Sequence, residues 1–178
     1  MNSESWHRIY DELAASCVHL FRDNGVELRL LEHQDSEATP GNAVVSFIGF
    51  TGDHLRGSLT IVAPVALITR CHPLRERRQL DEDMVCDWAS ELANQLLGRV
   101  KNRLRHLGLI IVLSTPSAAI GEHLRAREEQ SEGFRRLLFD AGTDRLAVLF
   151  DAMAPDTALE LEEVDMPEPQ REGEVLLF

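Results

Sequence analysis

The sequence predicts an α+β fold in which two long helices pack on one face of a mostly antiparallel sheet. Two long stretches carry apolar residues at three- and four-residue steps, which is typical of amphipathic helices, and each precedes shorter segments with strand character. The order helix, strand, strand, strand therefore occurs twice and suggests duplicated α-β-β-β halves. The chain has 178 residues, 44% of them hydrophobic, and this length suits one such domain.

The first half begins with a helix over residues 5–23, which Ser3 or Ser5 is expected to cap and Asn24-Gly25 to end. Polar residues with Pro40-Gly41 separate the first two of its strands and predict a loop. Pro64 then precedes a short helical turn over residues 65–70. The helix buries one stripe of residues: Trp6, Ile9, Leu13, Cys17, Leu20 and Phe21. The three strands are predicted over residues 26–31, 44–50 and 58–62.

The second half begins with the most clearly marked helix, which starts after Asp81 and stops at Gly108. Asp81 is a capping residue, and the acidic residues that follow it favour a helix N-terminus. Its buried stripe consists of Val85, Trp88, Leu92, Leu96, Val100 and Leu107. An apolar run over residues 109–113 predicts a buried strand, and residues 134–139 and 145–150 predict a hairpin around Gly142.

We expect residues 1–153 to form the domain and residues 154–178 an acidic, flexible tail. The net charge is −12, of which −7 falls in residues 156–178. The apolar end of the tail, Val175–Phe178, could dock as a strand or stay a free end, and its role is open.

Several classes of function are excluded by what the sequence lacks. An acidic chain does not suit a nucleic-acid groove, which needs a basic face. The longest apolar runs, Ala43–Phe50 and Leu107–Leu113, are too short to span a bilayer, and the N-terminus does not resemble a signal peptide. Three cysteines without C-x-x-C spacing, seven scattered histidines and the absence of phosphate-loop or hydrolase motifs predict a cytoplasmic protein with no metal site.

The second helix carries a polar face opposite its apolar stripe, formed by Asp87, Glu91, Asn94, Gly98 and Arg105. Glu91 and Asn94 are three residues apart and project together. A glycine inside a helix costs about 0.5–1 kcal/mol relative to alanine, so Gly98 indicates close approach by another surface. The alternative is an ordinary solvated face, with Gly98 admitting a loop of the same protein.

Residues 87–98 read D-W-A-S-E-L-A-N-Q-L-L-G and resemble the E-x-x-N-x-x-x-G signature of the CheX/CheC/FliY chemotaxis phosphatases. Residues 114–121, S-T-P-S-A-A-I-G, resemble the segment with proline and glycine that follows the signature helix in that family. With the repeated order of elements, the resemblance covers about residues 5–150 and implies a CheC-like fold.

The resemblance implies a phosphatase that removes the aspartyl phosphate of a CheY-like response regulator. In this reading Asn94 orients the attacking water, and Glu91 pairs with a lysine of the receiver domain. Asp87, Gly98 and Lys101 would contact the partner. The protein would need no cofactor of its own, because Mg²⁺ is expected in the active site of the partner receiver.

These residue types suit the reaction, because phosphoryl transfer depends on positioning and charge stabilisation. An amide oxygen accepts a hydrogen bond from water without repelling the phosphoryl group as a carboxylate would. The first helix has Glu12 followed by Ala15 rather than asparagine, so the resemblance implies a CheX-like, single-site homodimer. One alternative is a non-catalytic CheC-like module that docks a receiver domain or a flagellar-switch component. Another is that the resemblance is accidental and the chain is an α+β domain of unrelated role.

Overall fold

A computed structural model describes residues 2–32, 41–122, 124, 131–154 and 161. The structure has two long helices, one short helix and one antiparallel sheet, as predicted. The helices are α1 (Ser3–Asp23), α2 (Val65–Cys71) and α3 (Glu82–His106). The strands are β1 (Arg29–Leu30), β2 (Asn42–Thr51), β3 (Arg56–Pro64), β4 (Val112–Leu113), β5 (Ser117–Glu122), β6 (Arg135–Asp140) and β7 (Arg145–Met153).

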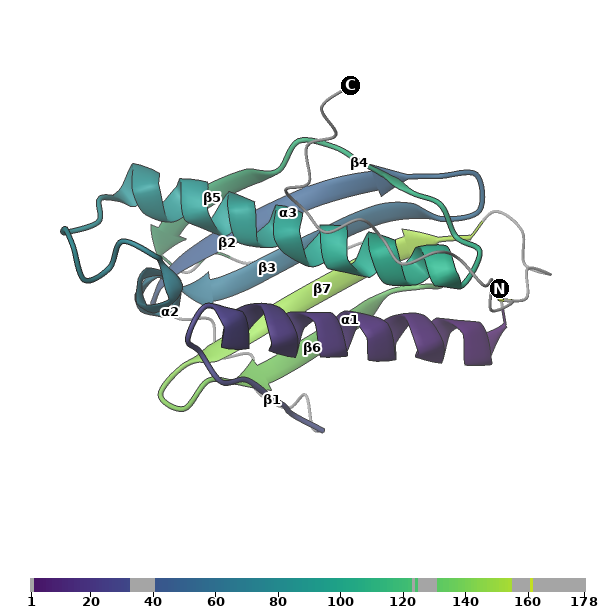
Figure 1. The fold of residues 1–178 in the computed structure, drawn as a ribbon, viewed down its shortest axis with the longest axis horizontal. Coiled ribbons are helices and arrows are strands. Elements are labelled where there is room, and N and C mark those ends of the chain that lie inside the picture. Colours follow the sequence, from purple (N-terminus) through teal and green to yellow (C-terminus); the bar gives the residue numbers. More distant parts are fainter. Residues whose placement is uncertain (1, 33–40, 123, 125–130, 155–160, 162–178) are drawn as a thin grey trace, which may run out of the picture.

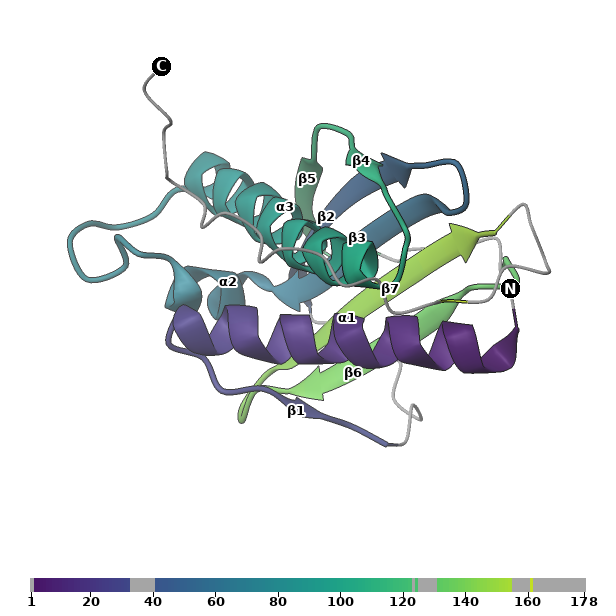
Figure 2. The same ribbon diagram turned by 45° about the vertical axis from the view of Figure 1, so that its right-hand side comes forward.

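Both long helices lie on one face of the sheet, α3 over the β2 side and α1 over the β6 side (Figures 1 and 2). The sequence explains this layering, because each helix buries a single apolar stripe. In α1 the stripe includes Ile9 and Leu13, and in α3 it includes Leu92 and Leu96, all fully buried. These side chains meet alternate residues of the strands, such as Ile48 and the other buried positions of β2, in one core.

The strand order shows how the two halves are joined. The hairpins β2–β3 and β6–β7 lie side by side through the pairing of β3 with β7. The short strand β1 of the first half pairs with β6 of the second half, and β5 of the second half pairs with β2 of the first. Each half thus supplies an edge strand to the other, and this confirms that the order of a helix followed by three strands occurs twice. The short strand β4 is an extra strand of the second half, and it also pairs with β2.

The start of α1 differs from the prediction. Asn2, rather than Ser3 or Ser5, caps the helix, and its side chain accepts a hydrogen bond from the Ser5 N–H at 2.8 Å. Asp81 caps α3 as predicted and accepts from the Met84 N–H at 2.9 Å. Both caps satisfy a backbone donor that the first helical turn leaves free.

Both long helices end in the same way, and this shortens the strands predicted after them. Gly25 and Gly108 have positive φ angles of 78° and 77°. The next residue in each case, Val26 or Leu109, donates its N–H back to the helix at 2.9 Å, which is the pattern of a Schellman cap. The first strand is therefore Arg29–Leu30 rather than residues 26–31.

The apolar run over residues 109–113 is also not a buried strand. Leu109 and Ile111 are buried, whereas Ile110 and Val112 are 71% and 63% exposed. An unbroken apolar run looks the same in the sequence whether the segment is buried on both sides or lies at the edge of a sheet with alternate side chains in solvent. Residues 117–122, which were expected only to follow the signature helix, form the edge strand β5.

The predicted tail falls outside the described residues, apart from Ala154 and Leu161, and so does its end Val175–Phe178. The carbonyl of Leu161 accepts a hydrogen bond from Arg8 of α1 at 3.3 Å. In the part of the chain that is described, no helix is both long and apolar enough to cross a membrane.

Candidate functional site

The candidate site lies on the outer face of α3. The inner face is fixed by Leu92, Ala93 and Leu96, which have no exposed surface. Their burial turns Glu91 and Asn94 outward, and both are exposed. The helix therefore holds the signature side chains on a rigid support and leaves them open to a partner.

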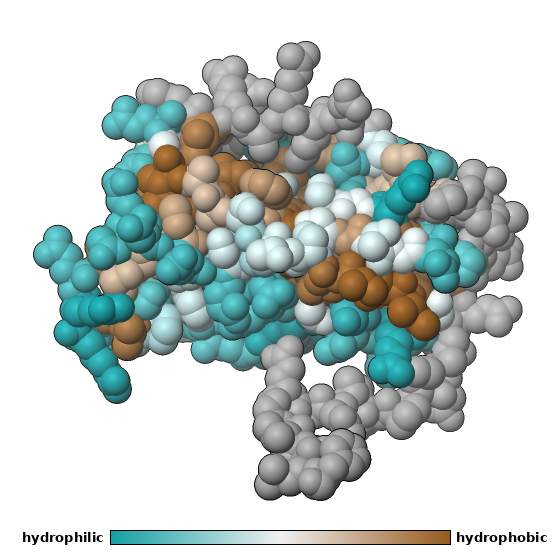
Figure 3. Space-filling model, turned by 90° about the horizontal axis from the view of Figure 1, so that it is seen from above, coloured by the Kyte–Doolittle hydropathy of each residue, from teal (hydrophilic) through white to brown (hydrophobic). Residues whose placement is uncertain are grey.

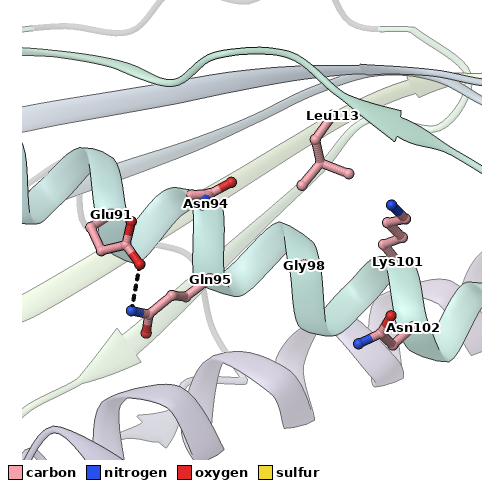
Figure 4. A pocket seen from close by; sticks show the side chains of 7 residues that line it. All are labelled: Glu91, Asn94, Gln95, Gly98, Lys101, Asn102 and Leu113. Carbon is pink, nitrogen blue, oxygen red and sulfur yellow. Dashed lines mark hydrogen bonds between the residues drawn. The ribbon is translucent and has the colours of Figure 1, made fainter. Parts of the chain in front are cut away.

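A groove of about 430 Å³ runs along this face (Figure 4). It brings together four of the five residues predicted for the site, because Glu91, Asn94, Gly98 and Lys101 all line it. Asp87 is exposed one turn before Glu91 but does not line the groove. Gln95, Asn102 and Leu113 complete the lining.

Glu91 is held by its own helix. The amide nitrogen Nε2 of Gln95 donates to Oε1 of Glu91 at 2.7 Å (Figure 4). This bond restricts the carboxylate and leaves its second oxygen able to accept from a cation or N–H group. The two residues stand four apart, the spacing at which side chains on a helix meet.

Asn94 and Lys101 face the side of the groove where Leu113 lies, whereas Glu91 and Gln95 point away from it (Figure 4). Leu113 belongs to β4, so this wall comes from the sheet rather than from the helix. The next residue fixes the wall, because Ser114 exchanges two hydrogen bonds of 2.9 Å with the backbone of Gly49.

A glycine turn allows the chain before β4 to lie close to the β2–β3 connection. A Cβ atom on Gly52 would lie 2.2 Å from the carbonyl oxygen of Ile110, so only glycine fits. Hydrophilic and hydrophobic surface lie side by side on this edge of the molecule, which faces the reader in Figure 3. The exposed side chains of Ile110 and Val112 contribute apolar surface to the chain beside the groove.

The N-terminal part of α3 rests on the end of α2. The rings of His72 and Trp88 are 5.4 Å apart, and the Leu74 N–H donates to Nδ1 of His72 at 2.9 Å. Burial lowers the pKa of His72, with a smaller contribution from Arg78. Burial also raises the pKa of Cys71 to about 11, so this thiol stays protonated and unreactive.

The matching face of α1 uses its residues differently. Glu12 accepts from Arg103 of α3 at 2.6 Å, and this ion pair joins the two helices. Ala15 provides no amide beside it. The single-site expectation thus agrees with how the residues of α1 are used.

Three groove residues escaped the sequence analysis. Gln95 could have been found, because it stands four residues after Glu91 on the same helix. Asn102 stands four residues after Gly98 in the same way. Leu113 could not have been found from the sequence, because only the path of the chain after α3 brings β4 to the groove. Among the residues that the structure describes, no group of three or more His, Cys, Asp or Glu side chains could hold a metal ion.

A family model, that of the chemotaxis phosphatase CheX, matches residues 44–140, which is more than half of the chain. No curated protein matches the sequence. Solved structures of similar fold include the chemotaxis protein CheX from Vibrio vulnificus, with 20% identity, a TM-score of 0.70, and 82% of this chain and 96% of that chain covered. A CheC-like superfamily protein from Shewanella sp. PV-4 has 19% identity and a TM-score of 0.72, with coverage of 86% and 100%.

A third similar structure is the complex of CheX with CheY, BeF₃ and Mg²⁺ from Borrelia burgdorferi. Its matching chain has 16% identity and a TM-score of 0.63, with 80% of this chain and 96% of that chain covered. At these identities the structural likeness establishes the CheC-like fold.

Proposed function

The chain belongs to the CheX family of chemotaxis phosphatases, and from this membership we propose that it accelerates hydrolysis of the aspartyl phosphate of a CheY-like response regulator. The observation that carries the proposal is the groove on α3, in which Glu91 and Asn94 stand exposed together. A similar structure from Borrelia burgdorferi is a complex of CheX with CheY, and this supports a receiver domain as the partner.

In the proposed mechanism Asn94 supplies the group that the receiver lacks. Its amide oxygen accepts a hydrogen bond from a water molecule and holds that water in line with the phosphorus–oxygen bond to the receiver aspartate. The amide carries no charge, so it does not repel the phosphoryl group. The water attacks, the aspartate leaves, and phosphate is released.

Glu91 anchors the partner by a charge-assisted hydrogen bond to the receiver lysine. Gln95 is a positioning residue in this scheme, because its bond to Oε1 leaves the other carboxylate oxygen for the lysine. Gly98 keeps the helix surface low where the receiver approaches, and Asp87 and Lys101 contact the partner away from the reacting groups. Mg²⁺ would be bound by the receiver.

The same proposal includes a cytoplasmic homodimer with residues 1–153 as the working domain. Response regulators act in the cytoplasm, so the phosphatase must meet its substrate there. Light scattering on the purified chain would give the oligomeric state, and a mass of twice the 20.0 kDa chain is expected.

The test is the rate of phosphate loss from a phosphorylated CheY-type receiver of the same cell, with and without this protein. We expect acceleration by the wild type and none by Asn94→Ala, whose melting temperature should stay within about a degree because Asn94 is exposed. If the protein binds receivers of that cell without accelerating phosphate loss, it is a non-catalytic binding module and the proposal is wrong.

A further inference from the structure

We propose that Lys101 binds a carboxylate on the receiver and thereby fixes the direction in which the receiver lies along α3. This inference rests on the proposed function, because it concerns the docking of the same partner. It assigns Lys101 a part in the specificity of binding and none in the chemistry of hydrolysis.

Lys101 is the only lysine in the sequence, and it lies exposed in the groove. The two arginines that flank it at a distance of two residues turn instead toward α1. Arg99 pairs with Asp23 at 2.9 Å, and Arg103 pairs with Glu12 at 2.6 Å. Lys101 has no ion pair with an acidic residue in the described part of the chain. Both arginines are thus paired within the protein, and the lysine stays available in the groove.

The position of Lys101 separates it from the reacting atoms. It stands seven residues beyond Asn94, which on a helix is about 10.5 Å along the axis on nearly the same face. A lysine side chain cannot span that distance to the phosphoryl group that Asn94 serves. It meets a different part of the receiver surface.

The groove consequently has opposite charges near its two ends. Glu91 and Lys101 are ten residues apart, or about 15 Å along the helix. The groove residues between them, Asn94, Gln95 and Gly98, carry no charge. A receiver that places a lysine against Glu91 and a carboxylate against Lys101 satisfies both ends. The reversed orientation would set like charges together at both ends, which disfavours it.

A lysine suits this task because its ammonium is a compact charge on a flexible stem and follows a single carboxylate. Figure 4 shows the side chain extended from α3 on the side of Leu113, with its ammonium group free of the other groove residues drawn. The partner group is therefore a carboxylate at the rim of the interface. Rim charges act mainly on the association rate and its dependence on salt.

The kinetic test compares Lys101→Gln with Arg22→Gln. Arg22 occupies the same register in α1 that Lys101 occupies in α3 and is exposed, so its variant removes one positive charge from the other helix. For Lys101→Gln we expect KM for the phosphorylated receiver to rise about two- to fivefold with kcat unchanged. The charge reversal Lys101→Glu should raise KM about tenfold and weaken the salt dependence. Arg22→Gln should leave both constants unchanged.

A second test does not need activity. Carbodiimide joins an amine to a carboxylate in direct contact, and Lys101 carries the only ε-amino group of this chain. With the receiver loaded with Mg²⁺ and BeF₃⁻, we expect a cross-linked peptide that joins Lys101 to an aspartate or glutamate of the receiver. Lys101→Gln should lose that peptide while retaining cross-links through receiver lysines.

The outcomes separate the two proposals. If the wild type accelerates hydrolysis and Lys101→Gln has the same KM and salt dependence, the role of Lys101 is wrong and the proposed function stands. If the wild type accelerates nothing, the proposed function fails, and the cross-link alone decides whether Lys101 contacts a receiver. Absence of the Lys101 peptide from a cross-linked complex would overturn the inference.

Discussion

The helices α1 and α3 begin 79 positions apart, at Ser3 and Glu82, and they hold equivalent places in the two halves of the fold. Each is capped by a side-chain oxygen, ends at a positive-φ glycine and buries one apolar stripe. Their outer faces differ at the same register. The equivalent pairs are Glu12 and Glu91, Ala15 and Asn94, His19 and Gly98, and Arg22 and Lys101.

The comparison shows that a shared residue type does not imply a shared role. Glu12 is engaged by Arg103 of the neighbouring helix. Glu91 has the same register, but its hydrogen bond is to Gln95 of its own helix, so it remains open to a partner. The difference arises from the neighbours of each glutamate, because Arg103 of α3 reaches Glu12, whereas the hydrogen bond of Glu91 comes from Gln95 of its own helix.

The largest expected difference between the helices is at Asn94. Asn94→Asp keeps the shape of the side chain but places a negative charge before the phosphoryl group, and we expect the catalysed rate to fall about 100-fold. The matched change Ala15→Asp in α1 should leave the rate unchanged. Phosphate release under single-turnover conditions measures both variants. Equal effects in the two helices would remove the distinction between them.

The two glutamates should respond in opposite ways. Glu91→Gln should weaken receiver binding about 30-fold, because the receiver lysine loses its charged partner, and should leave stability unchanged. Glu12→Gln should lower the free energy of unfolding by less than about 1 kcal/mol, because the ion pair with Arg103 is partly solvated. Titration calorimetry and urea denaturation provide the two readouts. A Glu12→Gln variant that loses receiver binding would place a second site on α1.

Replacement of Gly98 should stabilise the protein and weaken its binding to the receiver. Gly98→Ala should raise the free energy of unfolding by about 0.5–1 kcal/mol, because alanine is the better helix former. It should also weaken receiver binding, since the added methyl group raises the helix surface. His19→Ala at the same register of α1 should not change binding. If Gly98→Ala binds the receiver as the wild type does, close approach at this position is not needed.

The smallest expected effect is the pH dependence of stability that arises from His72, where α3 packs on the end of α2. Because the folded protein lowers the pKa of His72 below 6.5, the unfolded chain binds more protons between the two pKa values. The contribution of His72 to stability is therefore complete above about pH 6.5 and is lost as the pH falls through that window. Melting temperatures between pH 5 and 8 should show this slope, and His72→Gln should flatten it. If the slope is the same in His72→Gln as in the wild type, the pH dependence arises from other titratable groups.

Much of the fold could be predicted because local signals agreed with the tertiary structure. The β6–β7 hairpin follows from two apolar runs around Gly142, whose φ is 84°. The α3 helix follows from the Asp81 cap and its apolar stripe. The strand β5 was missed, because Ala118, Ala119 and Gly121 lack the branched or aromatic side chains that mark a strand. Its pairing with β2 overrides that weak propensity.

The candidate site divides in the same way. The residues of α3 could be predicted together, because helical spacing alone places Glu91, Asn94 and Gly98 on one face. The wall of the groove depends on where the chain turns after Gly108. Spacing within the sequence does not give that path, so the groove itself became visible only in the structure.

The most direct test of the central claim measures binding and hydrolysis together on Asn94→Ala. The claim is that α3 binds the receiver and that Asn94 accelerates the reaction within that complex. With the protein in excess over phosphorylated receiver, the account predicts that Asn94→Ala binds the Mg²⁺- and BeF₃⁻-loaded receiver as tightly as the wild type but does not accelerate phosphate loss. A variant that releases phosphate as fast as the wild type would contradict the account.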